Sequence, residues 1–121
     1  MNINKKELKR VKKTLKSLKK QQKKAEQLNQ MVGRKVIIRT YSAGVWFGML
    51  DKKAKNEVIV SNARRLWRWH TKKSISLSSV AIHGINYDKS RIAEPVNLVW
   101  LEAIEIIKCT KESVESIEGA E

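Results

Sequence analysis

Arginine and tryptophan alternate over residues 63–69, the part of the chain richest in chemically informative side chains. Three guanidinium groups and two indole rings lie within this segment. The planar guanidinium fork matches phosphate oxygens, and the flat indole face stacks on nucleobases. Side chains of a regular strand alternate between the two faces of its sheet. The sequence therefore predicts one face with a charge beside a stacking surface (Arg65, Trp67 and Trp69) and an opposite face with Arg64, Leu66 and Arg68.

The same motif has a structural interpretation that stays open at this point. Tryptophans in a small β-rich domain usually lie in the core, and arginines usually cover its rim. The sequence also predicts an irregular connection over residues 73–97, which contains Tyr87, Arg91 and Asn97. Binding groups often lie on such loops. In combination with the arginine cluster, these residues indicate a site for a ligand that carries phosphate.

Residues suited to catalysis or to metal binding are scarce. The chain has two histidines, His70 and His83, and one cysteine, Cys109, without His-x-x-x-His or Cys-x-x-Cys spacing. These are too few soft ligands for a zinc site. A phosphate-binding Gly-x-x-x-x-Gly-Lys motif does not occur either. We therefore expect a binding protein without enzymatic activity, metal or cofactor.

The composition favours one small domain with anionic partners. A chain of 121 residues that is 41% hydrophobic fits one modest core. Its 26 basic and 12 acidic residues give a formal charge of +14, which attracts nucleotides, nucleic acids or acidic surfaces. A single cysteine cannot form an intramolecular disulfide, and the apolar runs are too short for a leader or a membrane span. The sequence thus predicts a soluble, cytoplasmic protein.

Residues 1–32 are predicted to form a basic amphipathic helix. Residues 1–30 hold 11 of the 26 basic residues and only two acids. Apolar residues recur here at the three-and-four spacing of one helical face. Lysines beside this narrow stripe are expected to disfavour a self-paired parallel coil. Two alternatives remain, packing on the β-rich part of the chain or crossing a second copy at a steep angle. The stripe consists of Leu8, Val11, Leu15, Leu18, Ala25 and Leu28.

Residues 33–110 are predicted to form a β-rich ligand-binding module, because β-branched and aromatic residues alternate there with turn signals. The Ser42-Ala43-Gly44 segment is typical of a tight hairpin with a left-handed glycine, and residues 51–56 suit a longer polar turn. Thr110 can cap a short acidic helix over residues 111–121. The predicted fold class is α+β, a small antiparallel β-barrel or sandwich between a long basic helix and a short C-terminal helix. The expected strands are Arg34–Thr40, Val45–Leu50, Glu57–Ser61, Arg64–His70 and Leu98–Lys108.

Several blocks of sequence, taken together, resemble one known family. Roughly residues 33–118 resemble the phage-encoded Thoeris anti-defence sponge family, the first type described. The resemblance implies a β-rich homo-oligomer that sequesters a cyclic ADP-ribose signal made by bacterial immune enzymes, without degrading it, in the cytoplasm of an infected bacterial host. The blocks are Thr40–Gly48, Asn62–Arg65, Ser74–Ser78 and Ala103–Ile107 with Cys109-Thr110.

The resemblance also implies how the nucleotide is bound. In this family the nucleotide lies near a subunit interface, with its adenine stacked on an aromatic side chain and its phosphates met by basic side chains. Cyclic oligonucleotides are a second ligand class, which the surplus positive charge would suit. Trp69 of the Arg–Trp motif is a further candidate for ligand contact. By their position, the candidates are Tyr87 and Asn97 for the base and Arg64, Arg65 and Arg91 for phosphate.

A second resemblance points to a different class of binding protein. Val32–Val36, Gly44, Gly48–Asp51 and Asn56–Val60 are similar to the first motif of Sm-like proteins, small RNA-binding barrels that follow an N-terminal helix. Most of these positions are glycines and alternating apolar residues, which any strongly bent small sheet uses. An Sm-like module that binds RNA or DNA is therefore the alternative function, and a purely structural interaction protein is a third.

Overall fold

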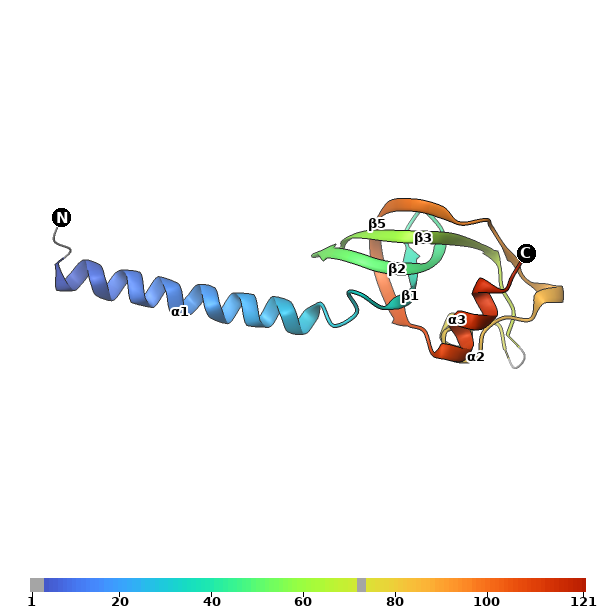
Figure 1. The fold of residues 1–121 in the computed structure, drawn as a ribbon, viewed down its shortest axis with the longest axis horizontal. Helices are drawn as coiled ribbons and strands as arrows, with labels where there is room; N and C mark the ends of the chain where they lie inside the picture. Colours follow the sequence, from blue (N-terminus) through green and yellow to red (C-terminus); the bar gives the residue numbers. More distant parts are fainter. Residues whose placement is uncertain (1–3, 72–73) are drawn as a thin grey trace. The chain divides into compact units, whose positions relative to one another are not determined.

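A computed structural model of the protein describes residues 4–71 and 74–121, without the side chains of residues 23–28 (Figure 1). The chain forms two compact units, Met1–Gln30 and Met31–Glu121. The described part of the first unit consists of one helix, and the second unit holds the strands and the shorter helices. The fold is of the α+β class, as the sequence predicts. None of the helices in the described residues is both long and apolar enough to span a membrane.

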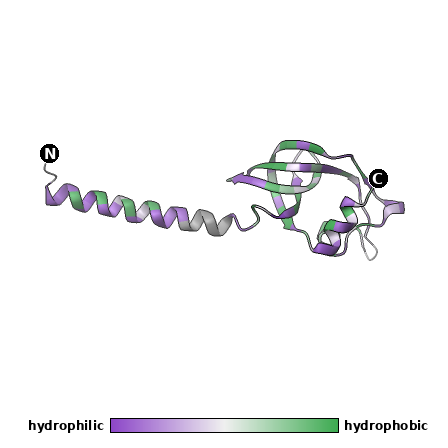
Figure 2. Cartoon of the chain, in the orientation of Figure 1, coloured by the Kyte–Doolittle hydropathy of each residue, from purple (hydrophilic) through white to green (hydrophobic). Residues whose placement is uncertain are grey.

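Helix α1, Lys5–Leu28, confirms the predicted amphipathic helix. Asn4 caps its first turn, because the Asn4 Oδ1 accepts a hydrogen bond from the Glu7 N–H at 2.8 Å. The 24 residues of the helix include no Gly or Pro. Apolar and polar residues follow one another along it at helical spacing (Figure 2).

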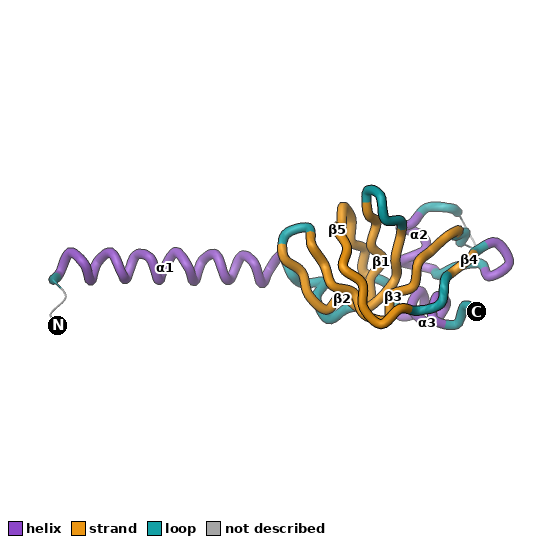
Figure 3. The backbone as a smooth tube through the Cα atoms, turned by 90° about the horizontal axis from the view of Figure 1, so that it is seen from above, coloured by secondary structure: helices purple, strands orange, loops and turns teal. Residues whose placement is uncertain are grey.

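Five antiparallel strands form the sheet of the second unit (Figure 3). The pairings β1–β2, β2–β3, β3–β5 and β5–β1 close a ring, so the sheet curves back on itself. The short strand β4 pairs with the end of β3. Closure of the ring gives these four strands a partner on both sides, which hides their edges. The strands are β1 (Lys35–Thr40), β2 (Val45–Ala54), β3 (Glu57–Arg68), β4 (Arg91–Ile92) and β5 (Val96–Lys108).

The first two turns of the sheet differ in how well the sequence predicts them. Gly44 has a φ of +88°, which confirms the left-handed glycine in the β1–β2 hairpin. The prediction of a long polar turn over residues 51–56 is wrong, because β2 continues to Ala54 and pairs there with Glu57. Lys52 and Lys53 pair with β3, which satisfies their backbone groups although their side chains are polar.

The segments expected as two strands, Glu57–Ser61 and Arg64–His70, form the single strand β3. Asn62 has a φ of +47°, and the register with β2 shifts at this position. Asn tolerates the left-handed conformation, so a β-bulge replaces the predicted break. The strand ends at Arg68, and Trp69 and His70 therefore lie beyond it.

The connection expected to be irregular contains three short elements. They are helix α2 (Leu77–His83), the 3-10 turn η1 (Tyr87–Lys89) and strand β4. Ser76 caps α2 by accepting a hydrogen bond from the Ser79 N–H at 3.1 Å, and the helix buries Val80 and Ala81. The prediction of an irregular segment is wrong because this cap and these apolar side chains stabilise a helical turn. Thr110 caps helix α3 (Lys111–Glu118), as predicted.

Two apolar clusters hold the second unit together. One joins the sheet to α2 and α3, and the other fills the space between the strands of the ring. Strand β1 contributes to both clusters, so it is buried on both faces. Prominent members of the first cluster are Ile37, Phe47, Leu66, Val80 and Ile117. Prominent members of the second are Val36, Ile38, Leu50, Val60 and Leu101.

Candidate functional site

The Arg–Trp motif forms a stack of one guanidinium group between two indole rings. The Arg65 Cζ lies 4.5 Å from the centroid of the Trp46 ring and 4.8 Å from that of the Trp67 ring. Trp46 and Arg65 are cross-strand partners on β2 and β3, and Trp67 follows on the same face of β3. Each contact is within the range of a cation–π interaction. The stack therefore fixes a positive charge next to an exposed indole, since Trp67 is 60% exposed.

Arg65 keeps an unused hydrogen-bond donor within this stack. Its Nε is buried and has no hydrogen-bond partner among the described residues. The neighbouring hairpin lies close to it, because a Cβ added at Gly44 would be 3.6 Å from the Arg65 Nε. Trp46 is held in place by a hydrogen bond of 2.9 Å from its Nε1 to the Ala43 carbonyl oxygen. The positions of the two stacked side chains are thus set by packing before any ligand binds.

A pocket of about 300 Å³ adjoins the stack at Trp67. The Trp69 Nε1 donates a hydrogen bond of 3.2 Å to the Ile75 carbonyl oxygen, which joins the two sides of the pocket. No carboxylate lines it among the described residues, and its volume is at the lower end of small-molecule sites. The lining residues are Trp67, Arg68, Trp69, His70 and Ile75.

Arg68, which lines this pocket, is paired with a second arginine on the neighbouring strand. Arg68 on β3 and Arg91 on β4 are partners in the antiparallel register, and both side chains are exposed. Like charges at directly opposite positions of a sheet destabilise it. Neither arginine forms an ion pair with a carboxylate of the described residues. An anion that bound between them would remove this repulsion, so the pair is suited to phosphate.

We name the whole set the Arg–Trp surface. It combines fixed and exposed cations with an exposed indole and a small apolar pocket, all on or next to β3 and β4. This combination can bind a flat aromatic group together with phosphate. The Arg–Trp surface consists of Trp46, Arg65, Trp67, Arg68, Trp69, His70, Ile75 and Arg91.

Arg64 and Tyr87, two of the predicted ligand residues, donate hydrogen bonds to the end of helix α3. Arg64 is 8% exposed and donates hydrogen bonds to the Ala93 carbonyl oxygen at 2.7 Å and the Ile117 carbonyl oxygen at 3.0 Å. The Tyr87 hydroxyl donates to the Ser116 carbonyl oxygen at 2.7 Å. The last carbonyl groups of a helix lack partners within the helix, and these side chains supply them. Arg64 therefore joins α3 to the sheet, and Tyr87 joins α3 to the turn η1.

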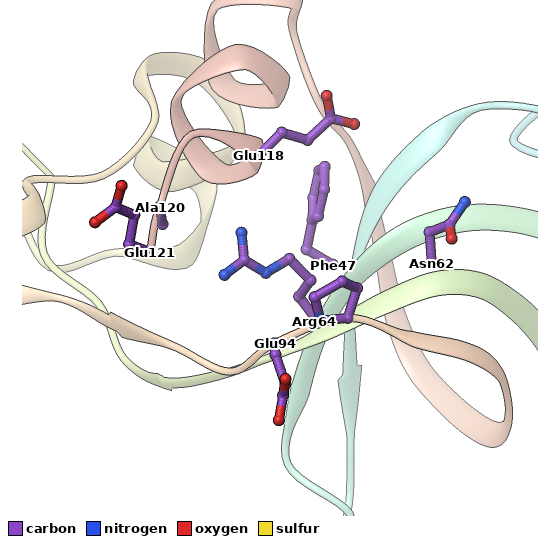
Figure 4. A pocket seen from close by; sticks show the side chains of 8 residues that line it. Phe47, Asn62, Arg64, Glu94, Glu118, Ala120 and Glu121 are labelled. Atoms are coloured by element: carbon purple, nitrogen blue, oxygen red, sulfur yellow. The ribbon is translucent and has the colours of Figure 1, made fainter.

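The pocket around Arg64 has a carboxylate-rich lining (Figure 4). Its volume is about 540 Å³, and the side chains of Arg64, Glu94 and Glu118 lie around it. Glu118 also forms an ion pair with Lys35. Three carboxylates against one arginine, whose charge is already shared with two carbonyl groups, disfavour a phosphate ligand here. The lining residues are Phe47, Asn62, Arg64, Glu94, Pro95, Glu118, Ala120 and Glu121.

The structure thus brings together some of the predicted ligand residues and separates others. Arg65, Trp69 and Arg91 belong to the Arg–Trp surface. Asn97 is exposed on β5 and lines neither of the two pockets described above. The predicted common face of Arg65, Trp67 and Trp69 holds for the first two only, because Trp69 lies beyond the strand and packs against the cluster that contains Leu66.

Trp46, Arg68 and His70 were not among the predicted ligand residues, and Trp67 was predicted only as part of the stacking face. The alternation of arginine and tryptophan already signals Trp67 and Arg68. The stacking of Trp46 on Arg65 depends on the β2–β3 register, and the pairing of Arg68 with Arg91 depends on the two-residue strand β4. Such pairings join residues far apart in the sequence, so they require the fold.

The titratable groups of the described residues give two further observations. No three His, Cys, Asp or Glu side chains lie close enough among them to hold a metal ion.

Burial raises the pKa of the Cys109 thiol to about 11, and a hydrogen bond with Ser113 acts in the opposite direction. A thiol with such a raised pKa is protonated at neutral pH and is a poor nucleophile.

The fold and the Arg–Trp surface define the class of this protein: a small α+β domain that presents basic and aromatic side chains on one exposed surface. The chain belongs to the family described as a domain of unknown function, DUF6948, which matches residues 33–117. The match covers the sheet and nearly all of α3, and α1 lies outside it. Comparisons with curated proteins and with solved structures gave no match.

Proposed function

We propose that this protein binds a signalling nucleotide of the cyclic ADP-ribose type at the Arg–Trp surface and sequesters it without degrading it. The observation that carries the proposal is the pair of opposed arginines, Arg68 and Arg91, beside the exposed indole of Trp67. A diphosphate between the two guanidinium groups and an adenine on the indole would use both features.

The stack of Arg65 between Trp46 and Trp67 supports this assignment. Arg65 covers part of the Trp67 ring and holds it in one orientation, so less side-chain entropy is lost when a base stacks on the exposed remainder. The surface is therefore preorganised for an aromatic anion.

Sequestration without turnover is consistent with the residues that line the pocket. His70 is the only imidazole among them, and neither a carboxylate nor a nucleophilic side chain accompanies it there. General acid–base catalysis needs a second group that holds or receives the proton. Binding alone requires only a slow dissociation rate, which is how affinity is mostly tuned among related complexes.

The biological role in the proposal rests on the resemblance of residues 33–118 to the anti-defence sponge family. The protein would lower the concentration of an immune signal in an infected bacterial cell and so protect the phage. Cyclic oligonucleotides, which also combine bases with phosphates, are further ligands to be compared.

Calorimetric titration with the linkage isomers of cyclic ADP-ribose tests the proposal. We expect one isomer to bind the wild-type protein, and the double variant Arg68→Gln, Arg91→Gln to bind it at least about tenfold more weakly, because each charged hydrogen bond contributes about 1.5–3 kcal/mol. The double variant Arg34→Gln, Lys111→Gln removes the same charge from exposed residues outside the pocket and serves as the control. Equal affinity of the two double variants would contradict the assignment.

A second candidate function is the binding of single-stranded RNA or DNA. The ring of antiparallel strands after an N-terminal helix favours it, because this is the arrangement of the Sm-like proteins that residues 32–60 resemble. Oligonucleotides in the same titration separate the two candidates. Nucleic-acid binding that neutralises many phosphates weakens steeply as salt rises, whereas a ligand with two phosphates shows a shallow dependence.

A further inference from the structure

Helix α1 carries a narrow row of exposed apolar side chains, Leu8, Val11, Leu15 and Leu18, which we call the seam. These side chains are 44–54% exposed, and their spacing is three, four and three residues. This spacing fills the a and d positions of a heptad repeat, with Leu8 and Leu15 at a and Val11 and Leu18 at d. A seam of a and d residues alone is narrower than the face that a helix buries against a globular core. It fits a second helix of the same kind.

The heptad also decides which charged residues adjoin the seam. The e positions hold Lys5, Lys12 and Lys19, whereas the g positions hold Glu7, Thr14 and Gln21. The remaining basic residues lie at the outer b, c and f positions and do not flank the seam. The lysines expected to disfavour a parallel coil therefore lie at only one border of the seam, and the other border is acidic or neutral.

This asymmetry selects the orientation of two paired helices. In a parallel pair each g position faces an e position of the other helix, so Glu7 meets the partner's Lys12 and Thr14 meets the partner's Lys19. In an antiparallel pair the e positions face each other, so lysine meets lysine. Glu7 has no ion pair with a described residue of its own chain and remains available.

We propose that α1 pairs with α1 of a second copy of this chain as a parallel, in-register coiled coil. Gln22 continues the a positions after Leu15, and a single polar a residue is known to specify register. Lipid is a poorer fit for the seam, because membrane-surface helices carry a wide apolar face with aromatic residues, and the described part of this seam has none. The pairing is independent of the nucleotide proposal, since α1 lies outside the family match.

Two consequences follow for the assembly. Nine basic residues and one acid lie between Lys5 and Gln22, so a parallel pair concentrates positive charge along one coil and is weakened by long-range repulsion. A parallel coil also places the two following β-rich units after the same end, because the chain continues from the C-terminus of each helix. Each dimer then presents two Arg–Trp surfaces.

Site-directed disulfide formation in the full chain tests the pairing and its orientation. In a parallel, in-register coil the Leu8 side chains of the two copies are adjacent across the seam, whereas Lys13 at an outer f position is remote from its copy. We expect Leu8→Cys to form a covalent dimer under mild oxidation and the matched variant Lys13→Cys to remain monomeric in gels. Cys109 does not interfere, because it is buried with a raised pKa.

The mass in solution provides the second readout. Light scattering should give at least twice 14.0 kDa for the wild-type chain, and Leu15→Gln should weaken association at least about tenfold, the factor that corresponds to 1.4 kcal/mol. Ser17→Gln, at an outer c position, is the control and should associate as the wild type does. The parallel pairing would be overturned if the two cysteine variants cross-linked equally, or if Leu15→Gln kept the mass of the wild type. It would also be overturned if Leu8→Cys chains cross-linked only to Leu18→Cys chains, which is the result of an antiparallel pair.

Discussion

Arg64 is the first of the phosphate-binding candidates that the sequence predicts. Replacing it distinguishes a role in stabilising the fold from a role in binding the ligand. The side chain is 8% exposed and donates to the Ala93 and Ile117 carbonyl oxygens at 2.7 and 3.0 Å. Arg64→Met keeps the length of the side chain and removes both donors. The substitution should therefore destabilise the second unit, whether or not ligand is present.

The magnitude follows from the two hydrogen bonds. A hydrogen bond to a charged group contributes about 1.5–3 kcal/mol, so an upper bound is about 6 kcal/mol. Arg64 borders an open pocket, and water can reach part of the space that the guanidinium leaves, which lowers the expected loss to about 3 kcal/mol. A domain of about 90 residues loses roughly 4–8 °C in Tm for each kcal/mol, so Tm should fall by roughly 12–24 °C.

Urea and thermal unfolding, followed by circular dichroism, measure this loss. Arg34→Met is the matched control, because Arg34 is exposed and lacks an ion pair among the described residues, and its free energy of unfolding should change by less than about 0.5 kcal/mol. If Arg64→Met unfolds as the wild type does and instead binds the nucleotide more weakly, Arg64 belongs to the ligand site and the structural reasoning is wrong.

Three further predictions concern packing, pH and the aromatic surface. Gly48→Ala should destabilise the sheet by about 1–3 kcal/mol in urea unfolding. The added Cβ would lie 2.6 Å from the Val60 Cγ1 and 2.9 Å from the Ser61 carbonyl oxygen. An unchanged urea midpoint would show that β2 and β3 can separate at no cost in free energy. Cys109 has a pKa of about 11 in the folded state against 9.0 in the unfolded state, so the unfolded chain releases the proton first and stability should fall by about 2–3 kcal/mol as pH rises through this window. Cys109→Ala should flatten this fall, and an equal slope in both proteins would refute the assignment. Trp67→Leu should weaken nucleotide binding by about 1–3 kcal/mol in calorimetry without lowering Tm, since the indole is 60% exposed; unchanged affinity would exclude stacking on it.

The sequence correctly predicted those helices and turns whose boundaries are set by residues close to them in the chain. The spacing of Leu8 to Leu18 predicted α1, the glycine at 44 predicted the first hairpin, and Thr110 predicted the start of α3. These features need only a helical period, a left-handed glycine or a capping hydroxyl. The long strand β5 was also predicted to within two residues of its start, because its apolar and β-branched content leaves few alternatives.

The candidate site could be predicted only in part, because it depends on pairings between distant segments. Arg64 donates hydrogen bonds to the carbonyl groups of Ala93 and Ile117, and no local pattern signals these partners. The stacking of Arg65 on Trp46 and the opposition of Arg68 and Arg91 likewise result from sheet register. Residue types in the Arg–Trp motif indicated a phosphate-binding surface, but the fold decides which arginines remain free for it.

Recovery of the bound ligand tests most directly the claim that the protein holds a cyclic ADP-ribose-type nucleotide without altering it. The protein is saturated with each linkage isomer, freed of unbound ligand, incubated and then denatured by heat, and the released small molecule is identified by chromatography and mass spectrometry. A slowly dissociating complex without a catalytic base should return the intact cyclic nucleotide, in a fixed ratio to the chain, for the isomer that binds in calorimetry. Accumulation of linear ADP-ribose, or failure to retain any isomer, would contradict the account.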